Sequence, residues 1–170
     1  LKSARGQTTI YLLSEGPGKG SVLTERRIKI GGSEYEQVKY IYQSEELKLH
    51  AISSEEHYRG GNLTYSIYYS YDDWGNLTRR YNTSNDLEET WTYQSHDRIK
   101  NLLKTSTQIN RNPVNEVVNK LTTTYTYDYY LSIGKPRSVK VASNLGGEQI
   151  TEFSYDPTYG NLTNRTDYDG

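Results

Sequence analysis

Few residues of this chain have types and spacing that could support acid–base or metal chemistry. Glu55 and Glu56 are followed directly by His57, which places two carboxylates beside an imidazole. Adjacent residues of an extended chain point to opposite faces, so this triplet would not converge on one substrate or ion. No second histidine follows at the spacing that zinc sites use. We therefore favour a solvated loop for His57, and we assign no role to His50 or His96.

A glycine-rich stretch near the amino end resembles a phosphate loop only superficially. Within residues 16–21, Lys19 is followed by Gly20 and then by strand-like sequence, whereas a phosphate loop continues from lysine to serine or threonine and into a helix. We expect a flexible hairpin loop there. The carboxylates are scattered, and they do not combine into a group of acid, base and nucleophile. The sequence predicts no enzyme, no catalytic residue, no metal site and no cofactor.

The composition favours a half-exposed β-sheet over a thick aliphatic core. The 170 residues include 18 Tyr, 1 Phe and 2 Trp, and only 33% of residues are hydrophobic. Tyrosine buries its ring and keeps its hydroxyl near water, which suits a sheet surface. Cysteine is absent, which excludes disulfides and thiolate metal sites. The net charge of −1 does not indicate a basic surface for binding nucleic acid. No apolar run approaches the roughly 18 residues that a membrane-spanning helix needs.

One sequence phrase occurs twice and explains several aspartates. A Tyr-Asp pair, a short gap and the run Gly-Asn-Leu-Thr occur at Tyr71, Asp72 and Gly75, and again at Tyr155, Asp156 and Gly160. An aspartate at the first position of a turn accepts backbone N–H bonds, and a glycine later in the turn supplies positive φ. This is the plan of a type I turn closed by a glycine bulge, a common hairpin connection. The sequence therefore predicts hairpin turns at both places.

Two aromatic residues with one residue between them precede each expected turn. Such pairs occur at residues 40–42, 69–71, 91–93, 125–127 and 153–155. Residues i and i+2 of a strand share a face, so each pair places two rings side by side. The copy ending at Tyr127 keeps its aspartate, Asp128, although its glycine, Gly134, comes late. The copies ending at Tyr42 and Tyr93 are more degraded.

These patterns predict an all-β fold of antiparallel β-hairpin repeats that form a curved, twisted sheet or ribbon. We expect residues 1–170 to be one continuous β-repeat segment, with leading strands in 1–34 and about five repeat units in 35–170. No long helix is expected. Methionine is absent, so we interpret the sequence as a fragment of a longer protein.

The two full copies of the phrase resemble the YD repeats of the Rhs family. The degraded copies extend the resemblance over roughly residues 35–170. The resemblance implies a β-hairpin ribbon that spirals into a large hollow shell, as in bacterial polymorphic toxins, in the B/C components of insecticidal toxin complexes and, more distantly, in teneurins. In the toxins, such a shell encloses a C-terminal toxic domain.

By this resemblance we expect a non-enzymatic segment of a toxin-enclosing shell that is secreted or displayed at the cell surface. The expected partners are neighbouring repeats of the same polypeptide, an encapsulated toxin domain and other toxin-complex subunits. Neither nucleic-acid binding nor membrane insertion is expected. The residues expected to form the repeat turns are Tyr71, Asp72, Gly75, Tyr127, Asp128, Tyr155, Asp156 and Gly160.

A carbohydrate- or cell-wall-binding module is the alternative from another functional class. Exposed tyrosine and tryptophan rings stack on sugars, and Trp74 and Tyr159 at the turns are the aromatic residues that we expect to face solvent most readily. The competing arrangement folds both rings back over the neighbouring hairpin. We favour that packing.

Overall fold

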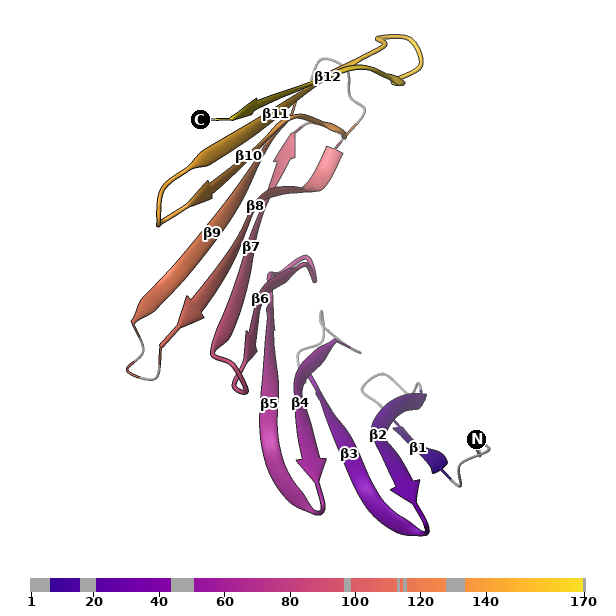
Figure 1. Ribbon diagram of the computed structural model, residues 1–170. Coiled ribbons are helices and arrows are strands. Elements are labelled where there is room, and N and C mark those ends of the chain that lie inside the picture. Colours follow the sequence, from indigo (N-terminus) through magenta and orange to yellow (C-terminus); the bar gives the residue numbers. More distant parts are fainter. Residues whose placement is uncertain are drawn as a thin grey trace. The chain divides into compact units, whose positions relative to one another are not determined.

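The computed structural model of the chain is an antiparallel β-meander in which strand order follows sequence order (Figure 1). It describes residues 7–15, 21–43, 51–96, 99–112, 114, 116–127 and 134–169. The twelve strands are β1 Gln7–Glu15, β2 Ser21–Ile30, β3 Ser33–Tyr42, β4 Ile52–Arg59, β5 Asn62–Tyr71, β6 Leu77–Asn82, β7 Leu87–His96, β8 Ile99–Arg111, β9 Val117–Tyr127, β10 Pro136–Ser143, β11 Glu148–Tyr155 and β12 Leu162–Asp169. The predicted all-β hairpin fold is confirmed. The described residues contain no helix with the length and hydrophobicity needed to cross a membrane.

The strands group into two compact units, which we describe separately. Residues 1–86 hold β1 to β6, and residues 87–170 hold β7 to β12. Consecutive strands pair antiparallel within the first unit and within the second. One continuous repeat segment, cut from a longer protein, stays a prediction.

Tight glycine turns connect some of these strands, as the glycine pairs of the sequence indicate. Gly31 and Gly32 join β2 to β3 with φ values of 58° and 86°, and Gly60 and Gly61 join β4 to β5 with φ values of 57° and 82°. Two-residue hairpin turns whose twist matches the strands require positive φ at both positions. Glycine adopts this conformation without steric cost, which is why the chain reverses at these pairs.

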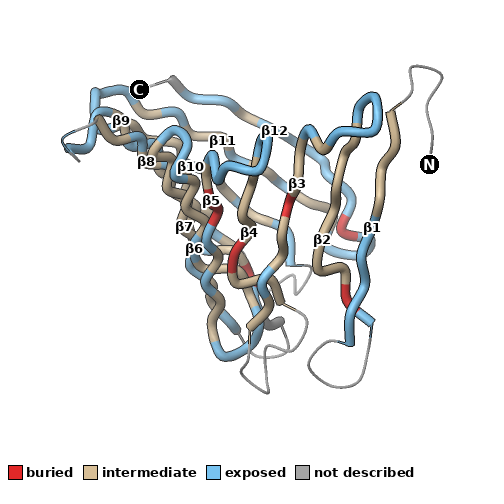
Figure 2. The backbone as a smooth tube through the Cα atoms, turned by 90° about the horizontal axis from the view of Figure 1, so that it is seen from below, coloured by how far each residue is buried: buried red, intermediate tan, exposed pale blue. Residues whose placement is uncertain are grey.

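The hydrophobic core is thin because each unit contains a sheet in a single layer. Among the described residues, the buried hydrophobic side chains are Val22, Val38, Ile67 and Leu102, and the buried polar ones are Ser54 and Ser66. Most of the backbone in Figure 2 is intermediate or exposed. Stability must therefore come largely from strand pairing and from half-buried rings, as a chain rich in tyrosine and poor in aliphatic residues predicts.

The two faces of the first unit differ in chemistry. Side chains that lie directly opposite each other on neighbouring strands share a face. One face, the aromatic face, holds the row Tyr40, Glu55 and Ile67 and the row Val38, His57 and Tyr65. The other face holds the row Lys39, Glu56 and Ser66. Hydrophobic burial at Val38 and Ile67 thus lies on the aromatic face.

Candidate functional site

The first intact turn is built around the carboxylate of Asp72, which follows β5. Its Oδ1 accepts the backbone N–H groups of Trp74 and Asn76, both at 2.9 Å, and its Oδ2 accepts the side-chain amide of Asn76 at 2.9 Å. The backbone N–H of Asp72 donates to the carbonyl of Asn76 at 3.0 Å, and that of Gly75 donates to the carbonyl of Asp72 at 3.1 Å. Gly75 has a φ of 81°. The carboxylate therefore holds the turn closed.

The second intact turn is likewise built around a carboxylate, that of Asp156. Its Oδ1 accepts the backbone N–H groups of Thr158 at 2.9 Å and Tyr159 at 2.7 Å. The backbone N–H of Asp156 donates to the carbonyl of Asn161, and that of Gly160 donates to the carbonyl of Asp156, both at 2.8 Å. Gly160 has a φ of 67°. The extra residue of this copy lengthens the loop and changes the carboxylate contacts, because Asp156 Oδ1 bonds the N–H of Tyr159 before the turn glycine, whereas Asp72 Oδ1 bonds the N–H of Asn76 after it. The main-chain bonds to the glycine and the asparagine are the same in both turns.

Tyrosines at the ends of β3, β5, β9 and β11 reach back over the preceding strand. Their hydroxyls donate to main-chain carbonyls: Tyr42 to Leu23 at 2.7 Å, Tyr71 to Ile52 at 3.0 Å, Tyr127 to Leu103 at 2.9 Å and Tyr155 to Pro136 at 2.9 Å. We call these four residues the lock tyrosines. Burial raises the pKa of the hydroxyls of Tyr42, Tyr71 and Tyr155. Each lock covers a strand with its ring and satisfies one of its acceptors.

The strand that returns from each aromatic pair is bulged at a recurring position. On β6, Thr78 lies between the partners of Ser70 and Tyr71 and has no residue opposite it on β5. On β12, Thr163 lies in the same way between the partners of Ser154 and Tyr155. At the corresponding places in other strand pairs, the residues without an opposite partner are Thr24, Ser53, Lys104 and Arg137. The threonine of the Gly-Asn-Leu-Thr run therefore lies at a β-bulge, a feature that locally interrupts the ladder.

Hydroxyls at these bulges restore hydrogen bonds across the interrupted ladder. Thr24 Oγ1 donates to the carbonyl of Leu12 at 3.3 Å, and Ser53 Oγ donates to the carbonyl of Ile41 at 2.9 Å. The bulge between β1 and β2 places Leu13 where the later hairpins have their aromatic anchor. The first hairpin thus follows the same geometry as the later ones. From the sequence, this hairpin was predicted only as leading strands.

Further turns share this design, and sequence reasoning did not identify the polar side chains that close them, although it expected a reversal at Gly146 and Gly147. Asn112 Oδ1 accepts the backbone N–H groups of Val114 at 3.2 Å and Glu116 at 2.8 Å. Ser143 Oγ accepts the backbone N–H of Leu145 at 3.1 Å, while Gly146 N donates to the carbonyl of Ser143 at 3.2 Å. A short polar side chain that begins a turn was the available signal. It was overlooked because neither turn follows a Tyr-Asp pair.

The described residues predicted to form the repeat turns lie at strand ends or in the turns themselves. Tyr71 and Tyr155 end their strands and precede the closed turns, and Tyr127 ends β9 as a lock tyrosine. Asp128 lies outside the described residues. A common role of these residues as YD-repeat turns stays a prediction.

The preference for packed Trp74 and Tyr159 rings is wrong in this structure. Trp74 is 81% exposed and Tyr159 is 80% exposed. Both residues directly precede the turn glycine, and both use their backbone N–H to bond the turn aspartate. With the backbone fixed in this way, their side chains point out of the turn.

The solvated-loop interpretation of His57 is also wrong. His57 lies in β4 with a side chain that is 13% exposed, and its ring stacks on Tyr65 with centroids 4.2 Å apart and planes 13° apart. Its Nε2 lies 3.2 Å from Glu55 Oε2, because residues i and i+2 of a strand share a face. Tyr69 donates to Glu55 Oε1 at 2.9 Å. Burial first, and this hydrogen bond second, raise the pKa of Tyr69 to about 12.

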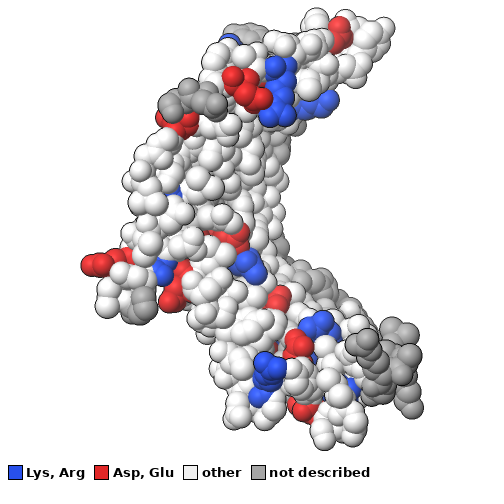
Figure 3. Space-filling model, in the orientation of Figure 1, with Lys and Arg blue, Asp and Glu red and all other residues white. Residues whose placement is uncertain are grey.

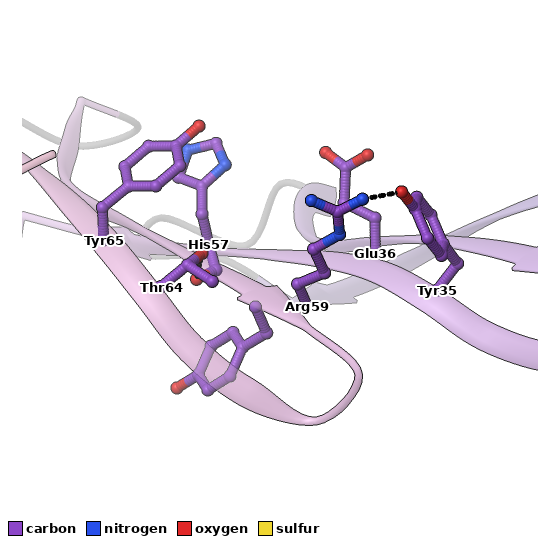
Figure 4. A pocket seen from close by; sticks show the side chains of 7 residues that line it. Tyr35, Glu36, His57, Arg59, Thr64 and Tyr65 are labelled. Atoms are coloured by element: carbon purple, nitrogen blue, oxygen red, sulfur yellow. Dashed lines mark hydrogen bonds between the residues drawn. The ribbon is translucent and has the colours of Figure 1, made fainter.

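A groove of about 360 Å³ lies beside this stack, at the end of the β4–β5 hairpin (Figure 4). Its lining comes from β3, β4 and β5 and consists of Tyr35, Glu36, His57, Tyr58, Arg59, Thr64 and Tyr65. The Arg59 guanidinium donates to the Tyr35 hydroxyl and lies over the Tyr35 ring, 4.8 Å from its centroid. Glu36 is the direct cross-strand neighbour of Arg59. Rings and opposite charges therefore face one small space.

Charges of both signs lie interspersed on the face of the molecule that Figure 3 shows. Glu25 is an example from the first unit: a hydrogen bond from Arg27 lowers the pKa of its carboxyl, and Gln37 donates to it at 2.6 Å. No group of three or more potential metal ligands is present among the described residues. The side chain of His96 and residues 16–20 lie outside the described part, so the loop expected there is not described.

Comparisons with known proteins support the fold. No protein-family model and no curated protein matches the sequence. The structure matches a chain of the "Crystal Structure of TcdB2-TccC3-Cdc42", a toxin complex of B and C components, with a TM-score of 0.57 and 16% sequence identity. The match covers 94% of this chain and 9% of that chain, so this chain spans a small part of its length. The chain therefore shares the fold of a segment of the Rhs/YD-type shell that its repeats resemble.

Proposed function

We propose that the chain is a non-enzymatic wall segment of an Rhs/YD-repeat shell that encapsulates or presents a toxin domain in a secreted or surface-delivered bacterial toxin. The observation that supports this most directly is the single-layered meander of hairpins, similar in fold to the toxin-complex chain. Units that pair only with their neighbours supply wall area in proportion to chain length. The proposed partners are neighbouring repeats, an enclosed toxin domain and other subunits of a toxin complex.

The chemistry of the turn aspartates also fits a structural role. Asp72 and Asp156 both accept backbone N–H groups inside their own turns. A catalytic carboxylate needs a substrate-facing oxygen and a partner acid or base, and the described residues near these turns supply no such arrangement. We therefore propose no enzymatic activity for this segment.

Protection of a cargo domain tests the proposal in the full-length gene product. The cargo domain is expected to resist a protease in the intact protein and to be cleaved once the wall is opened. Asp72→Ala removes the acceptor that closes one turn and should increase cleavage. Asp73→Ala is the matched control, because Asp73 is exposed in the same turn. Full sensitivity of the cargo domain in the unaltered protein would reject encapsulation.

A glycan-binding module is the second candidate, and the exposure of Trp74 and Tyr159 favours it. Two rings at equivalent turn positions, each at least 80% exposed, are available for stacking on a sugar or cell-wall polymer. Retention on a glycan array that is lost in Trp74→Ala would support this function. Equal retention of both proteins would count against it.

A further inference from the structure

The groove at the end of the β4–β5 hairpin differs from the exposed turn aromatics in combining ring faces with two opposite charges. Figure 4 shows the His57 and Tyr65 rings on one side, and Glu36, Arg59 and Tyr35 on the other. All of these residues belong to the first unit. The volume of about 360 Å³ lies at the small end of the range of ligand pockets, which suits one ring-sized ligand.

The aromatic wall of the groove is formed by a stacked pair of rings. The His57 and Tyr65 rings are nearly parallel and belong to directly opposed residues of β4 and β5. Thr64 Oγ1 donates to the carbonyl of His57 at 2.7 Å, which fixes the bulge beside the stack. A fixed planar surface binds the flat apolar face of a ligand at a low cost in conformational entropy.

The charged wall is also held in place, by contacts with neighbouring side chains. Arg59 stacks over Tyr35 and donates to its hydroxyl, and no carboxylate of the described residues lies within ion-pair distance of it. Glu36 Oε1 lies 3.4 Å from the guanidinium of Arg26, on the neighbouring strand β2. The two charged groups are thus oriented by other partners, and each keeps hydrogen-bonding capacity for a ligand.

The pair of charges selects against ligands with a net charge. A lone anion would be attracted by Arg59 and repelled by Glu36, whose charge the neighbouring Arg26 offsets in part, and a lone cation would meet the reverse. A neutral ligand with neighbouring hydroxyls satisfies both groups, because one hydroxyl donates to the carboxylate and another accepts from the guanidinium. A ring with a flat apolar face and several hydroxyls fits both walls. We propose that the groove between His57–Tyr65 and Glu36–Arg59 is a binding site for a neutral pyranose ring.

Saturation-transfer NMR with methyl glycosides of neutral hexoses tests this site on the intact chain. Hexose ring protons are expected to receive saturation at millimolar sugar, and methyl glycosides of uronic acids and amino sugars should give weaker signals. Arg59→Gln is expected to weaken neutral-sugar binding about tenfold, which corresponds to loss of one good polar contact. Arg79→Gln is the matched control, because Arg79 also lies over a tyrosine ring, Tyr81, at 5.3 Å. Circular dichroism verifies that each variant is folded.

Charge-altering variants separate this site from generic stacking. Glu36→Gln leaves Arg59 without its opposing charge and should raise the relative binding of uronic acids. Arg59→Gln should raise that of amino sugars. Trp74→Ala should leave these signals unchanged, which separates the groove from the turn aromatics.

Several outcomes would overturn the assignment. One is the absence of a hexose signal at tens of millimolar sugar. Another is that uronic acids bind as well as neutral hexoses. A third is an equal loss of hexose binding in Arg59→Gln and Arg79→Gln, and a fourth is a preference among charged sugars that the variants do not alter. The shell proposal does not depend on these results, since cargo protection is measured without any sugar.

Discussion

Removal of one phenol hydroxyl measures how much the lock tyrosines stabilise the sheet. Tyr71→Phe keeps the ring over β4 and deletes the 3.0 Å hydrogen bond to the carbonyl of Ile52. A neutral hydrogen bond contributes about 0.5–1.5 kcal/mol net, and an acceptor left unpaired in a half-buried place adds to the loss. We therefore expect the free energy of unfolding to fall by about 1–1.5 kcal/mol. Tyr71→Ala, which also removes ring burial, should cost about 3 kcal/mol or more.

The assay must resolve the two units, because a single global transition would mix them. Hydrogen exchange read by mass spectrometry on peptides of β4 and β5 reports the unit that contains Tyr71. Tyr68→Phe is the matched control on the same strand, since Tyr68 is 47% exposed and no hydrogen bond of its hydroxyl occurs in the described structure.

Two results would refute the lock. One is Tyr71→Phe exchanging like Tyr68→Phe. The other is Tyr71→Phe losing as much stability as Tyr71→Ala, because the ring would then contribute nothing. Corresponding losses in Tyr42→Phe, Tyr127→Phe and Tyr155→Phe would extend the conclusion to all four lock tyrosines.

The remaining predictions concern the turns and the titration of Tyr69. Asp72→Ala should reduce the free energy of unfolding by about 1–2 kcal/mol. Asp72→Asn should reduce it less, because an amide oxygen still accepts the two N–H groups, as Asn112 does in its own turn. Urea denaturation of both variants checks this order. Gly75→Ala should cost about 1 kcal/mol in the same assay, since no atom lies within 4 Å of the added Cβ and only the φ of 81° opposes it. Burial raises the pKa of Tyr69 from its ordinary value of 10.0 to about 12, so the stabilising contribution of the neutral phenol is complete below pH 10 and is lost as pH rises toward 12. Urea midpoints across this window should therefore fall less steeply in Tyr69→Phe than in the unaltered protein. Trp74→Ala should change the free energy of unfolding by less than about 0.5 kcal/mol, because the ring is 81% exposed.

The repeated turns were predictable because their chemistry is local. Asp72 and Gly75 lie three positions apart and Asp156 and Gly160 lie four apart, and a turn requires little more than such a short spacing and those residue types. The aromatic pairs indicated strand ends for a similar reason, since alternation along a strand is visible in the sequence. The all-β fold and the hairpin meander follow from these two signals.

The groove and the locks were not predictable because they depend on register between strands. His57 and Tyr65 meet only because a bulge at Thr64 sets which residues are opposed. The acceptor of the Tyr71 hydroxyl lies 19 residues away along the chain. A shift of one residue in register would move either side chain to the other face, and the sequence alone does not specify that register.

The lock geometry shows what tyrosine supplies at four positions that phenylalanine could not, in a chain with 18 Tyr and a single Phe. A single-layered sheet has no second layer to cover a large apolar ring, so a ring on its surface is only half-buried and its far end meets water or backbone. The bulge beside each aromatic anchor interrupts the ladder, and the lock tyrosines place a hydroxyl against a carbonyl of the preceding strand. Phenylalanine would bury the same ring area and leave that carbonyl without the bond. A phenol therefore satisfies both requirements of a thin wall, coverage and hydrogen bonding, with one side chain.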